Sequence, residues 1–251
     1  MDDRQVFGVV EGDAGAEVLA VVEGDPLYTP LRPTGEHVPL SEVKLLTPVI
    51  PRSKVVGVGR NYADHAAELG NEVPAEPLIF LKPNTTVCSP GDAIRYPQQS
   101  TEVHFEGELA VVIGRLCSDV PAARAAEVIF GYTVANDVTA RDLQRSDDQW
   151  TRAKGFDSFC PLGPWIVTDL DVTDLALTTE LNGELKQAAR TAAMVHKVPD
   201  LIAWISSVMT LLPGDVILTG TPAGVGPMKP GDEVSVSIEG IGTLTNPVVA
   251  R

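Results

Sequence analysis

Two glutamates separated by a single residue have the type and spacing of metal ligands. Glu106 and Glu108 lead into the apolar run 109–113, which is typical of a strand buried on both faces. Because side chains alternate along a strand, both carboxylates project from the same face, about 7 Å apart. Carboxylates placed this closely at the mouth of a buried strand repel each other, and a cation between them removes that cost. The alternative for an isolated Glu-x-Glu pair is a solvated strand face.

A third carboxylate, Asp137, follows another strand-like run at 129–135 and precedes a helix-compatible segment. At such a junction an aspartate acts either as a helix N-cap or as an inward-facing ligand, and the position alone favours the cap. Three carboxylates without a cluster of Cys or His would form an all-oxygen site. Such a site suits Mg²⁺ or Mn²⁺ and leaves positions open for water and substrate.

His65 and Glu68 stand three residues apart in segment 62–69, which has a helical pattern. Residues at this spacing share a helical face, so the carboxylate could orient the imidazole as a general base. The same pair is also common on exposed helices. The chain lacks the His-Glu-x-x-His pattern of a zinc site. Gly57, Gly59 and Asn71 flank the segment and favour a mobile flap.

Lys154 and the loop 219–227 are two further candidates for contacts with a substrate. Lys154 leads into an apolar segment rich in Pro and Gly, where its ammonium could neutralise a substrate oxygen. A surface lysine is the alternative. The loop 219–227 follows the apolar strand 216–218 and offers backbone N–H groups and hydroxyls that suit a carboxylate. Without other observations, a simple turn is the better interpretation of this loop.

The composition restricts the class of partner. The chain has 251 residues, of which 44% are hydrophobic, and 19 basic against 34 acidic residues give a net charge of −15. A field of this sign repels nucleic acid and anionic membrane surfaces, and an anionic substrate would need a local cation. The absence of a leader-like segment and of an apolar run near ~18 residues predicts a cytoplasmic protein. The three cysteines are expected to be small buried hydrophobes.

The remaining pattern predicts a small N-terminal appendage at 1–49 and a larger domain at 50–251. In the appendage, Val-Val-Glu-Gly-Asp occurs at 9–13 and again at 21–25, which predicts two short strands ending in turns. In the larger domain, Pro-Gly-Asp precedes three β-branched or alternating runs and predicts a turn followed by a strand. These triplets start at residues 90, 213 and 230. Helical patterns are fewer and lie at 62–69, 121–129, 138–150 and 199–212. We therefore expect a mainly β fold with peripheral helices, of the α+β class.

Six segments, taken in this order, resemble the fumarylacetoacetate hydrolase family, in particular its short bacterial acylpyruvate hydrolase and 2-hydroxyhepta-2,4-diene-1,7-dioate isomerase type. The segments are Gly59-Arg60-Asn61-Tyr62-Ala63-Asp64-His65, Phe80-Leu81-Lys82-Pro83, Phe105-Glu106-Gly107-Glu108-Leu109-Ala110, Asn136-Asp137-Val138-Thr139-Ala140-Arg141-Asp142, Lys154-Gly155-Phe156-Asp157 and Thr219-Gly220-Thr221-Pro222-Ala223-Gly224-Val225. Each motif alone is weak, but six in register are specific. The resemblance runs from about residue 54 to the C-terminus. It implies a mixed β-sandwich roll that is usually a homodimer.

The resemblance also implies roles for individual residues. The matched metal ligands, for Mg²⁺ or Mn²⁺, would be Glu106, Glu108 and Asp137. The matched catalytic residues would be His65 and Glu68, as the dyad of a lid helix, and Lys154, which polarises the substrate. The matched contacts to substrate oxygens or carboxylate would be Arg60, Arg141, Gln144 and Thr221. One departure is Arg190-Thr191, where family members often have Asn-Thr. Arg190 could therefore alter which substrate tail is accepted.

The resemblance implies a small 2-oxo or 2,4-dioxo carboxylic acid as substrate and a metal-stabilised enolate as the shared intermediate. Hydrolysis of a C–C bond in an acylpyruvate ranks first. The alternatives on the same site are isomerisation of a hydroxymuconate-type diacid and decarboxylation of oxaloacetate. A non-catalytic metal-binding module is a different class of interpretation. The presence of His65, Glu68 and Lys154 argues against it, because such a module needs none of them.

Overall fold

The computed structural model describes residues 4–13 and 15–251, and the chain divides into two compact units, 1–45 and 46–251. The first unit holds an antiparallel sheet in the order β1-β2-β3, formed by Phe7–Glu11, Val18–Val22 and Pro33–Pro39. A short 3₁₀ turn, Leu40–Glu42, follows β3. The two copies of the repeat supply β1 and β2, as predicted, and Gly12 and Gly24 adopt positive φ just after them. Glycine tolerates this backbone conformation, so it suits the turns.

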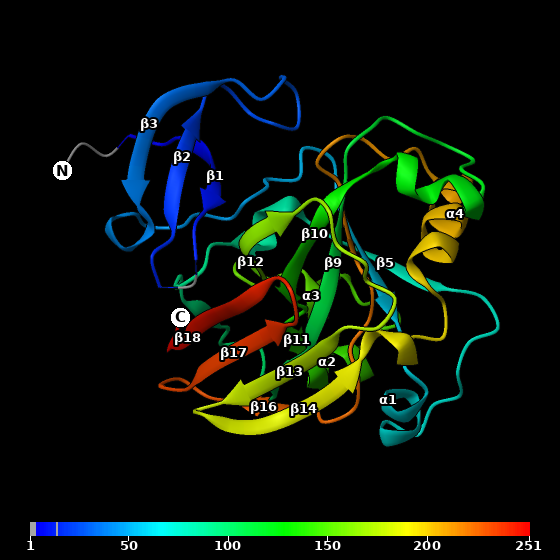
Figure 1. Cartoon of the computed structure of the whole chain (residues 1–251). Helices are drawn as coiled ribbons and strands as arrows, with labels where there is room; N and C mark the ends of the chain where they lie inside the picture. The colour runs from blue at the N-terminus through cyan, green and yellow to red at the C-terminus, as the bar shows by residue number, and fades with distance from the viewer. Residues whose placement is uncertain (1–3, 14) are drawn as a thin grey trace. The chain divides into compact units, whose positions relative to one another are not determined.

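A seven-stranded mixed sheet forms the first layer of the second unit (Figure 1). In spatial order its strands are β5 (Leu78–Lys82), β4 (Val55–Gly59), β15 (Val216–Leu218), β9 (Gly107–Ile113), β10 (Ile129–Asn136), β12 (Cys160–Val167) and β6 (Val87–Cys88). Every residue of β9 is buried. The apolar run 109–113 therefore forms a strand covered on both faces, as predicted from the sequence.

A five-stranded sheet forms the second layer, and Figure 1 shows most of it as one curved surface. Its strands, in spatial order, are β14 (Glu184–Arg190), β13 (Ala176–Leu181), β17 (Glu233–Ile238), β18 (Gly242–Ala250) and β7 (Ile94–Tyr96). Along β17, Val234, Val236 and Ile238 are buried and alternate with partly exposed residues. Val236 belongs to the same apolar cluster as Leu109 of β9, so this cluster joins the two layers.

A third, small sheet adjoins both segments that carry the candidate ligands. Its strands are β11 (Thr139–Ala140), β8 (Val103–Phe105) and β16 (Gly226–Met228), in that order. Glu106 alone separates β8 from β9, and Asp137 and Val138 separate β10 from β11. The chain thus crosses between the small sheet and the seven-stranded sheet twice, at Glu106 and at Asp137. The two crossings are adjacent, since the Asp137 N–H donates to the Glu106 carbonyl (2.8 Å).

The α-helices of the described residues are short, and all but one lie at predicted positions with shifted ends; the exception is Thr151–Lys154, where no helix was expected. They are α1 (Ala63–Glu68), α2 (Arg141–Ser146), α3 (Thr151–Lys154) and α4 (Val198–Val208), with 3₁₀ turns at Asn84–Thr86, Ala122–Glu127 and Thr191–Ala193. The helix expected at 138–150 is shortened because Thr139 and Ala140 pair with β8. The helix expected to reach 212 ends at Val208, because Leu211 leaves it to form a bridge with Cys117. Within the expected helix 121–129, only Ala122–Glu127 is helical, as a 3₁₀ helix, and Ile129 begins β10.

The mainly β class with peripheral helices is confirmed, and β7, β15 and β17 each follow a Pro-Gly-Asp triplet as predicted. The cysteines at 117 and 160 are buried, whereas Cys88 is only partly buried, and all three are free. Among the described residues, no helix combines the length and apolar character needed to cross a membrane.

Candidate metal centre

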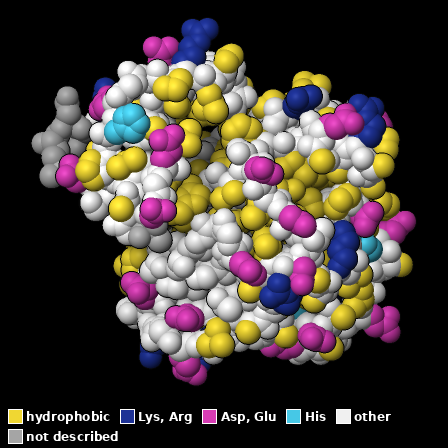
Figure 2. All heavy atoms as spheres, viewed as in Figure 1, with side chains coloured by type: hydrophobic (Ala, Val, Ile, Leu, Met, Phe, Trp, Pro, Cys, Tyr) yellow, Lys and Arg dark blue, Asp and Glu magenta, His cyan; other side chains and the backbone are white. Residues whose placement is uncertain are grey.

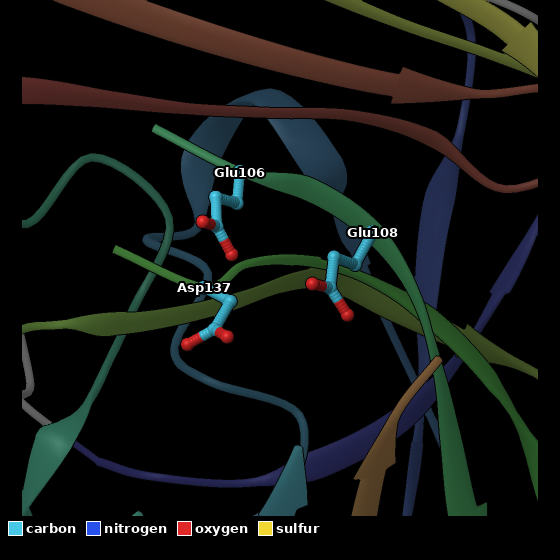
Figure 3. Close-up of side chains that lie close together, drawn as sticks. All are labelled: Glu106, Glu108 and Asp137. Carbon is cyan, nitrogen blue, oxygen red and sulfur yellow. The ribbon is translucent and has the colours of Figure 1, made fainter. Parts of the chain in front are cut away.

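The three candidate ligands lie close together where the chain crosses between the small sheet and the seven-stranded sheet. Glu106, Glu108 and Asp137 can each place one carboxylate oxygen within 4.8 Å of the others, and Figure 3 shows their carboxylates grouped together. Their exposed fractions are 4%, 1% and 1%. The solvated-face interpretation of Glu-x-Glu is therefore wrong. The cap interpretation of Asp137 is also wrong, because Ala140 occupies the N-cap position of α2.

Three basic side chains compensate these carboxylates. The ammonium of Lys154 lies 2.8 Å from Glu106 Oε2 and 2.5 Å from Asp137 Oδ2. Lys82 reaches the other oxygen of Asp137 at 2.5 Å, and Arg141 pairs with Glu106. Lys82 lies in the Phe80–Pro83 motif but was not predicted as a site residue. The sequence signal for it is a charged residue at the end of the apolar run 78–81.

The pKa values follow from this uneven compensation. Burial alone would raise the pKa of Glu106, but Lys154 and Arg141 outweigh burial and hold it well below the ordinary range. Burial raises the pKa of Glu108 well above its ordinary value, and the charges of Asp137 and Glu106 add to the effect. The pKa of Lys154 is raised, because Asp137 and Glu106 outweigh the lowering effect of burial.

The donor set fits a divalent cation. Glu108 has the least compensated of the three carboxylates, because it forms no ion pair with a described residue and accepts the Gly220 N–H at Oε2 (2.6 Å). Burying a carboxylate without a nearby cation is costly, and a cation among the three oxygens removes the cost. Carboxylate oxygens are the ligands that Mg²⁺ and Mn²⁺ prefer. Glu106, Glu108 and Asp137 would therefore hold the ion.

The predicted dyad is formed on α1. His65 Nδ1 lies 3.2 Å from Glu68 Oε2, and the imidazole is buried. The other carboxylate oxygen of Glu68 accepts the Gly224 N–H (3.0 Å). Glu68 therefore orients the imidazole and holds α1 against the loop 219–227. Because Nδ1 is used by Glu68, Nε2 remains as the ring nitrogen that can exchange a proton with a substrate.

A cavity of about 300 Å³ collects most of the predicted site residues. Those that line it are Arg60, His65, Glu106, Glu108, Arg141, Gln144, Lys154 and Thr221. Glu68 and Asp137 are not part of this lining, but they contact His65 and Lys154, which are. Arg145, which was not predicted, adds a fourth basic side chain to the wall. Acidic side chains are scattered over the face shown in Figure 2, so the cavity supplies the local positive charge that an anionic substrate needs in an acidic protein.

Two other sequence features, Arg190 and the loop 219–227, are placed differently from what was expected. Arg190 ends β14 and pairs with Asp174 (2.5 Å) on an exposed surface, outside the cavity lining, so its position removes the reason to assign it a role in substrate selection. In the loop 219–227, two backbone N–H groups bind protein carboxylates, those of Glu108 and Glu68. These two donors are therefore not free for a substrate carboxylate.

Comparison with known proteins agrees with this geometry. Residues 54–249 match the family model described as "Fumarylacetoacetate (FAA) hydrolase C-terminal", and residues 1–48 match the one described as "Rv2993c-like, N-terminal". The chain therefore belongs to the fumarylacetoacetate hydrolase family. Its resemblance to this family, drawn from six short motifs, is confirmed.

Among its relatives is Protein Rv2993c of Mycobacterium tuberculosis, 58% identical over 99% of this chain and 96% of the relative. Human oxaloacetate tautomerase FAHD2A, a mitochondrial protein, is 48% identical over 84% of this chain and 71% of its own length. A solved structure of 5-carboxymethyl-2-hydroxymuconate delta-isomerase from Mycobacterium smegmatis is 56% identical, with a TM-score of 0.91 over 98% of this chain and 95% of that chain. Fumarylpyruvate hydrolase from Pseudomonas aeruginosa, solved with Mn²⁺ and pyruvate, is 32% identical, with a TM-score of 0.76 over 80% and 91% of the two chains.

Proposed function

We propose that this protein is a divalent-metal-dependent enzyme that interconverts the keto and enol forms of a 2-oxo acid, as a tautomerase or isomerase. The observation that carries the proposal is one cavity that holds a proton-exchanging histidine, a buried lysine and two of three clustered carboxylates. A bound Mg²⁺ or Mn²⁺ would polarise the 2-oxo oxygen and make the neighbouring C3–H more acidic.

The basic lining of the cavity recruits the substrate. The positive charges of the lining attract its carboxylate; they belong to Arg60, Arg141, Arg145 and Lys154. Within the protein, Arg141 also pairs with Glu106, Arg145 with Glu102, and Lys154 with Glu106 and Asp137. Phe80 and Trp150 also line the cavity and exclude water from the apolar part of the substrate. The site therefore favours a small acid with a short carbon chain.

The proton moves between C3 of the substrate and His65. Nε2 takes a proton from C3, the C–H electron pair forms a C2=C3 double bond, and the carbonyl electrons move to the C2 oxygen. Glu68 stabilises the resulting imidazolium through Nδ1, and the ammonium of Lys154 stabilises the enolate oxygen. Protonation of that oxygen yields the enol, and the reverse sequence returns the keto acid. The atom that receives the proton then decides the outcome. Protonation at C3 or at the oxygen interconverts the tautomers, whereas protonation at a carbon further along a conjugated chain moves the double bond.

Hydrolysis of an acylpyruvate is the second candidate, and the fumarylpyruvate hydrolase solved with Mn²⁺ and pyruvate supports it. In that reaction the same dyad would activate water to attack the distal carbonyl, and the enolate would leave as pyruvate. Decarboxylation of oxaloacetate passes through the same enolate. We place tautomerisation first because the relatives named as isomerase and tautomerase are 56% and 48% identical to this chain. The fumarylacetoacetate hydrolase of Exiguobacterium antarcticum and the fumarylpyruvate hydrolase are 36% and 32% identical.

Three assays on the full chain separate these reactions. Loss of the ultraviolet absorbance of enol-oxaloacetate without pyruvate formation reports tautomerisation, pyruvate from oxaloacetate reports decarboxylation, and pyruvate from acetylpyruvate reports hydrolysis. We expect Mg²⁺-dependent tautomerisation that a chelator abolishes. His65→Gln should lower the rate by about 100-fold or more, as expected when a general base is removed.

His37→Gln is the matched control, since His37 is an exposed histidine of the first unit. The proposal is wrong if His65→Gln keeps the wild-type rate, or if none of the three reactions depends on the metal. Pyruvate release from acetylpyruvate at a higher rate than tautomerisation would move hydrolysis to first place.

A further inference from the structure

We infer that Gln187, on the five-stranded sheet, is a positioning residue for the metal centre and acts together with Thr221 on the backbone of Gly107. Gly107 is the residue between Glu106 and Glu108, and Gln187 lies 80 residues further along the chain. The inference rests on the proposed metal-dependent function. It adds a residue that neither the motifs nor the cavity lining assigns to the site.

The three residues form a closed ring of hydrogen bonds. The Gly107 N–H donates to Gln187 Oε1 (3.0 Å), the Gln187 amide donates to Thr221 Oγ1 (2.8 Å), and the Thr221 hydroxyl donates to the Gly107 carbonyl (2.9 Å). The amide also donates to the Pro222 carbonyl (2.8 Å). Since Gln187 is fully buried and uses both ends of its amide, its orientation is determined.

The ring exists because of the break between β8 and β9. At such a break the backbone loses ladder partners, and buried polar groups need replacements. The Glu106 N–H finds one in Asn136 Oδ1 (2.9 Å), and both polar groups of Gly107 find theirs in the ring. Side-chain groups from two other strands and a loop thus hold the peptide units on either side of the candidate ligands.

Gly107 allows Gln187 to come this close. A Cβ at this position would lie 2.2 Å from Thr179 Oγ1 and 2.9 Å from Val236 Cγ1, distances that real Cβ atoms essentially never show. The seven-stranded and five-stranded sheets therefore pack against each other at Gly107 without an intervening side chain. Backbone hydrogen bonds are the means by which the second sheet can orient Glu106 and Glu108.

The ring also changes the role expected for Thr221. Its hydroxyl proton is donated to Gly107, and its oxygen accepts the Gln187 amide. A hydroxyl has one proton to donate, so Thr221 has none left for a substrate carboxylate. Thr221 lines the cavity but acts as a positioning residue through Gly107.

The test compares direct Mn²⁺ binding, measured by electron paramagnetic resonance of the free ion, with thermal unfolding in chelator. Gln187→Met removes all the amide hydrogen bonds at similar volume, and Thr221→Val removes the hydroxyl. We expect both to weaken Mn²⁺ binding about 10-fold or more, as for other residues that orient metal ligands. Thr221→Ser keeps the hydroxyl and should restore wild-type affinity.

Thr179→Val is the matched control. Thr179 faces Gly107 across the same contact between sheets, and its buried hydroxyl has no partner among the described residues. Its replacement should leave Mn²⁺ affinity unchanged. A purely structural role for the ring would lower the melting temperature of Gln187→Met and Thr221→Val while the folded protein kept its affinity, and that result overturns the inference.

The outcomes separate this inference from the proposed function. If Mn²⁺ affinity falls as expected but no tautomerase, decarboxylase or hydrolase activity is found, the inference stands and the proposed function fails. If activity is present and the ring variants bind Mn²⁺ as the wild type does, the inference alone fails. Wild-type protein that binds no Mn²⁺ overturns both. Should Gln187→Met not fold, the contrast between Thr221→Val and Thr221→Ser decides.

Discussion

Lys154 and Asp137 lie 2.5 Å apart inside the second unit, and Arg152 and Asp147 lie 2.5 Å apart on its surface. The side chains of the first pair are 2% exposed each, whereas those of the second are 55% and 23% exposed. An exposed pair exchanges hydration for an ion contact with little net gain. A buried pair has lost its hydration, so each charge depends on its protein partners. The two ion pairs therefore differ in how much each charge depends on its partner, and the cause is burial, since the distances are equal.

The two regions also differ in how their charges are connected. In the interior, Asp137 contacts both Lys82 and Lys154, and Glu106 contacts both Lys154 and Arg141. On the surface, by contrast, the Arg124–Glu127 pair joins one arginine to one glutamate three residues further along the chain. Replacing buried charges by apolar residues is often neutral or stabilising in other proteins, so a buried cluster is weak evidence for a role in stability. Glu106, Arg141 and Lys154 of this cluster line the cavity, which points to a role in the chemistry of the site.

The largest effect is expected from Lys154→Met, which removes the cation shared by Glu106 and Asp137. In chelator, the free energy of unfolding should fall by about 3–5 kcal/mol, because two buried carboxylates lose a partner. Urea denaturation measures this change. Saturating Mg²⁺ should stabilise the variant more than the wild type, since the ion takes over part of the compensation. Equal stability of the two proteins in chelator would show that burial does not make this lysine necessary.

An intermediate effect is expected from Asp142→Asn, at a partly buried carboxylate. Asp142 accepts hydrogen bonds from Ser100 Oγ (2.6 Å), the Thr101 N–H (2.8 Å) and the Leu143 N–H (2.9 Å). Burial would raise its pKa, but these hydrogen bonds outweigh burial and lower the pKa below the ordinary 3.8. The ionised form therefore stabilises the fold above the pKa of the unfolded chain, and this contribution is lost as the pH falls through the lower folded value.

At neutral pH, Asp142→Asn should reduce the free energy of unfolding by about 1 kcal/mol. The difference from the wild type should shrink as the pH falls below about 4. Denaturation midpoints measured across this pH range give the comparison. A difference that grows on acidification would contradict the sign of the pKa shift.

The smallest effect is expected from Arg124→Ala, at an exposed pair of 2.7 Å. Both partners are solvated, so removing one leaves the other hydrated, and the midpoint of urea denaturation should stay within experimental error of the wild type. Glu127→Ala should give the same result. A clear loss of stability in either variant would show that distance alone can make a surface pair important.

Much of the second unit could be predicted because its signals are local. The apolar run 109–113 indicates a strand covered on both faces, and Pro-Gly-Asp indicates a turn before each of three strands. Helix ends were less predictable, because they depend on distant strands. Thr139 and Ala140 pair with β8, and Leu211 pairs with Cys117, so both helices are shorter than their patterns indicate.

By itself, the sequence determined the candidate ligands, the dyad and the order of the six motifs, because the types and spacing of these residues are read along the chain. The family resemblance already implied that Asp137 is a ligand, although its position along the chain favoured a cap, and the tertiary structure decided between the two. The tertiary structure alone showed that Lys82 compensates Asp137 and that Arg190 lies outside the cavity lining. The contact of Gln187 with Gly107 was likewise shown only by the tertiary structure, since the two residues are 80 positions apart. The physical reason is that burial and hydrogen-bond partners arise where two sheets meet, and spacing along one strand carries no information about the other.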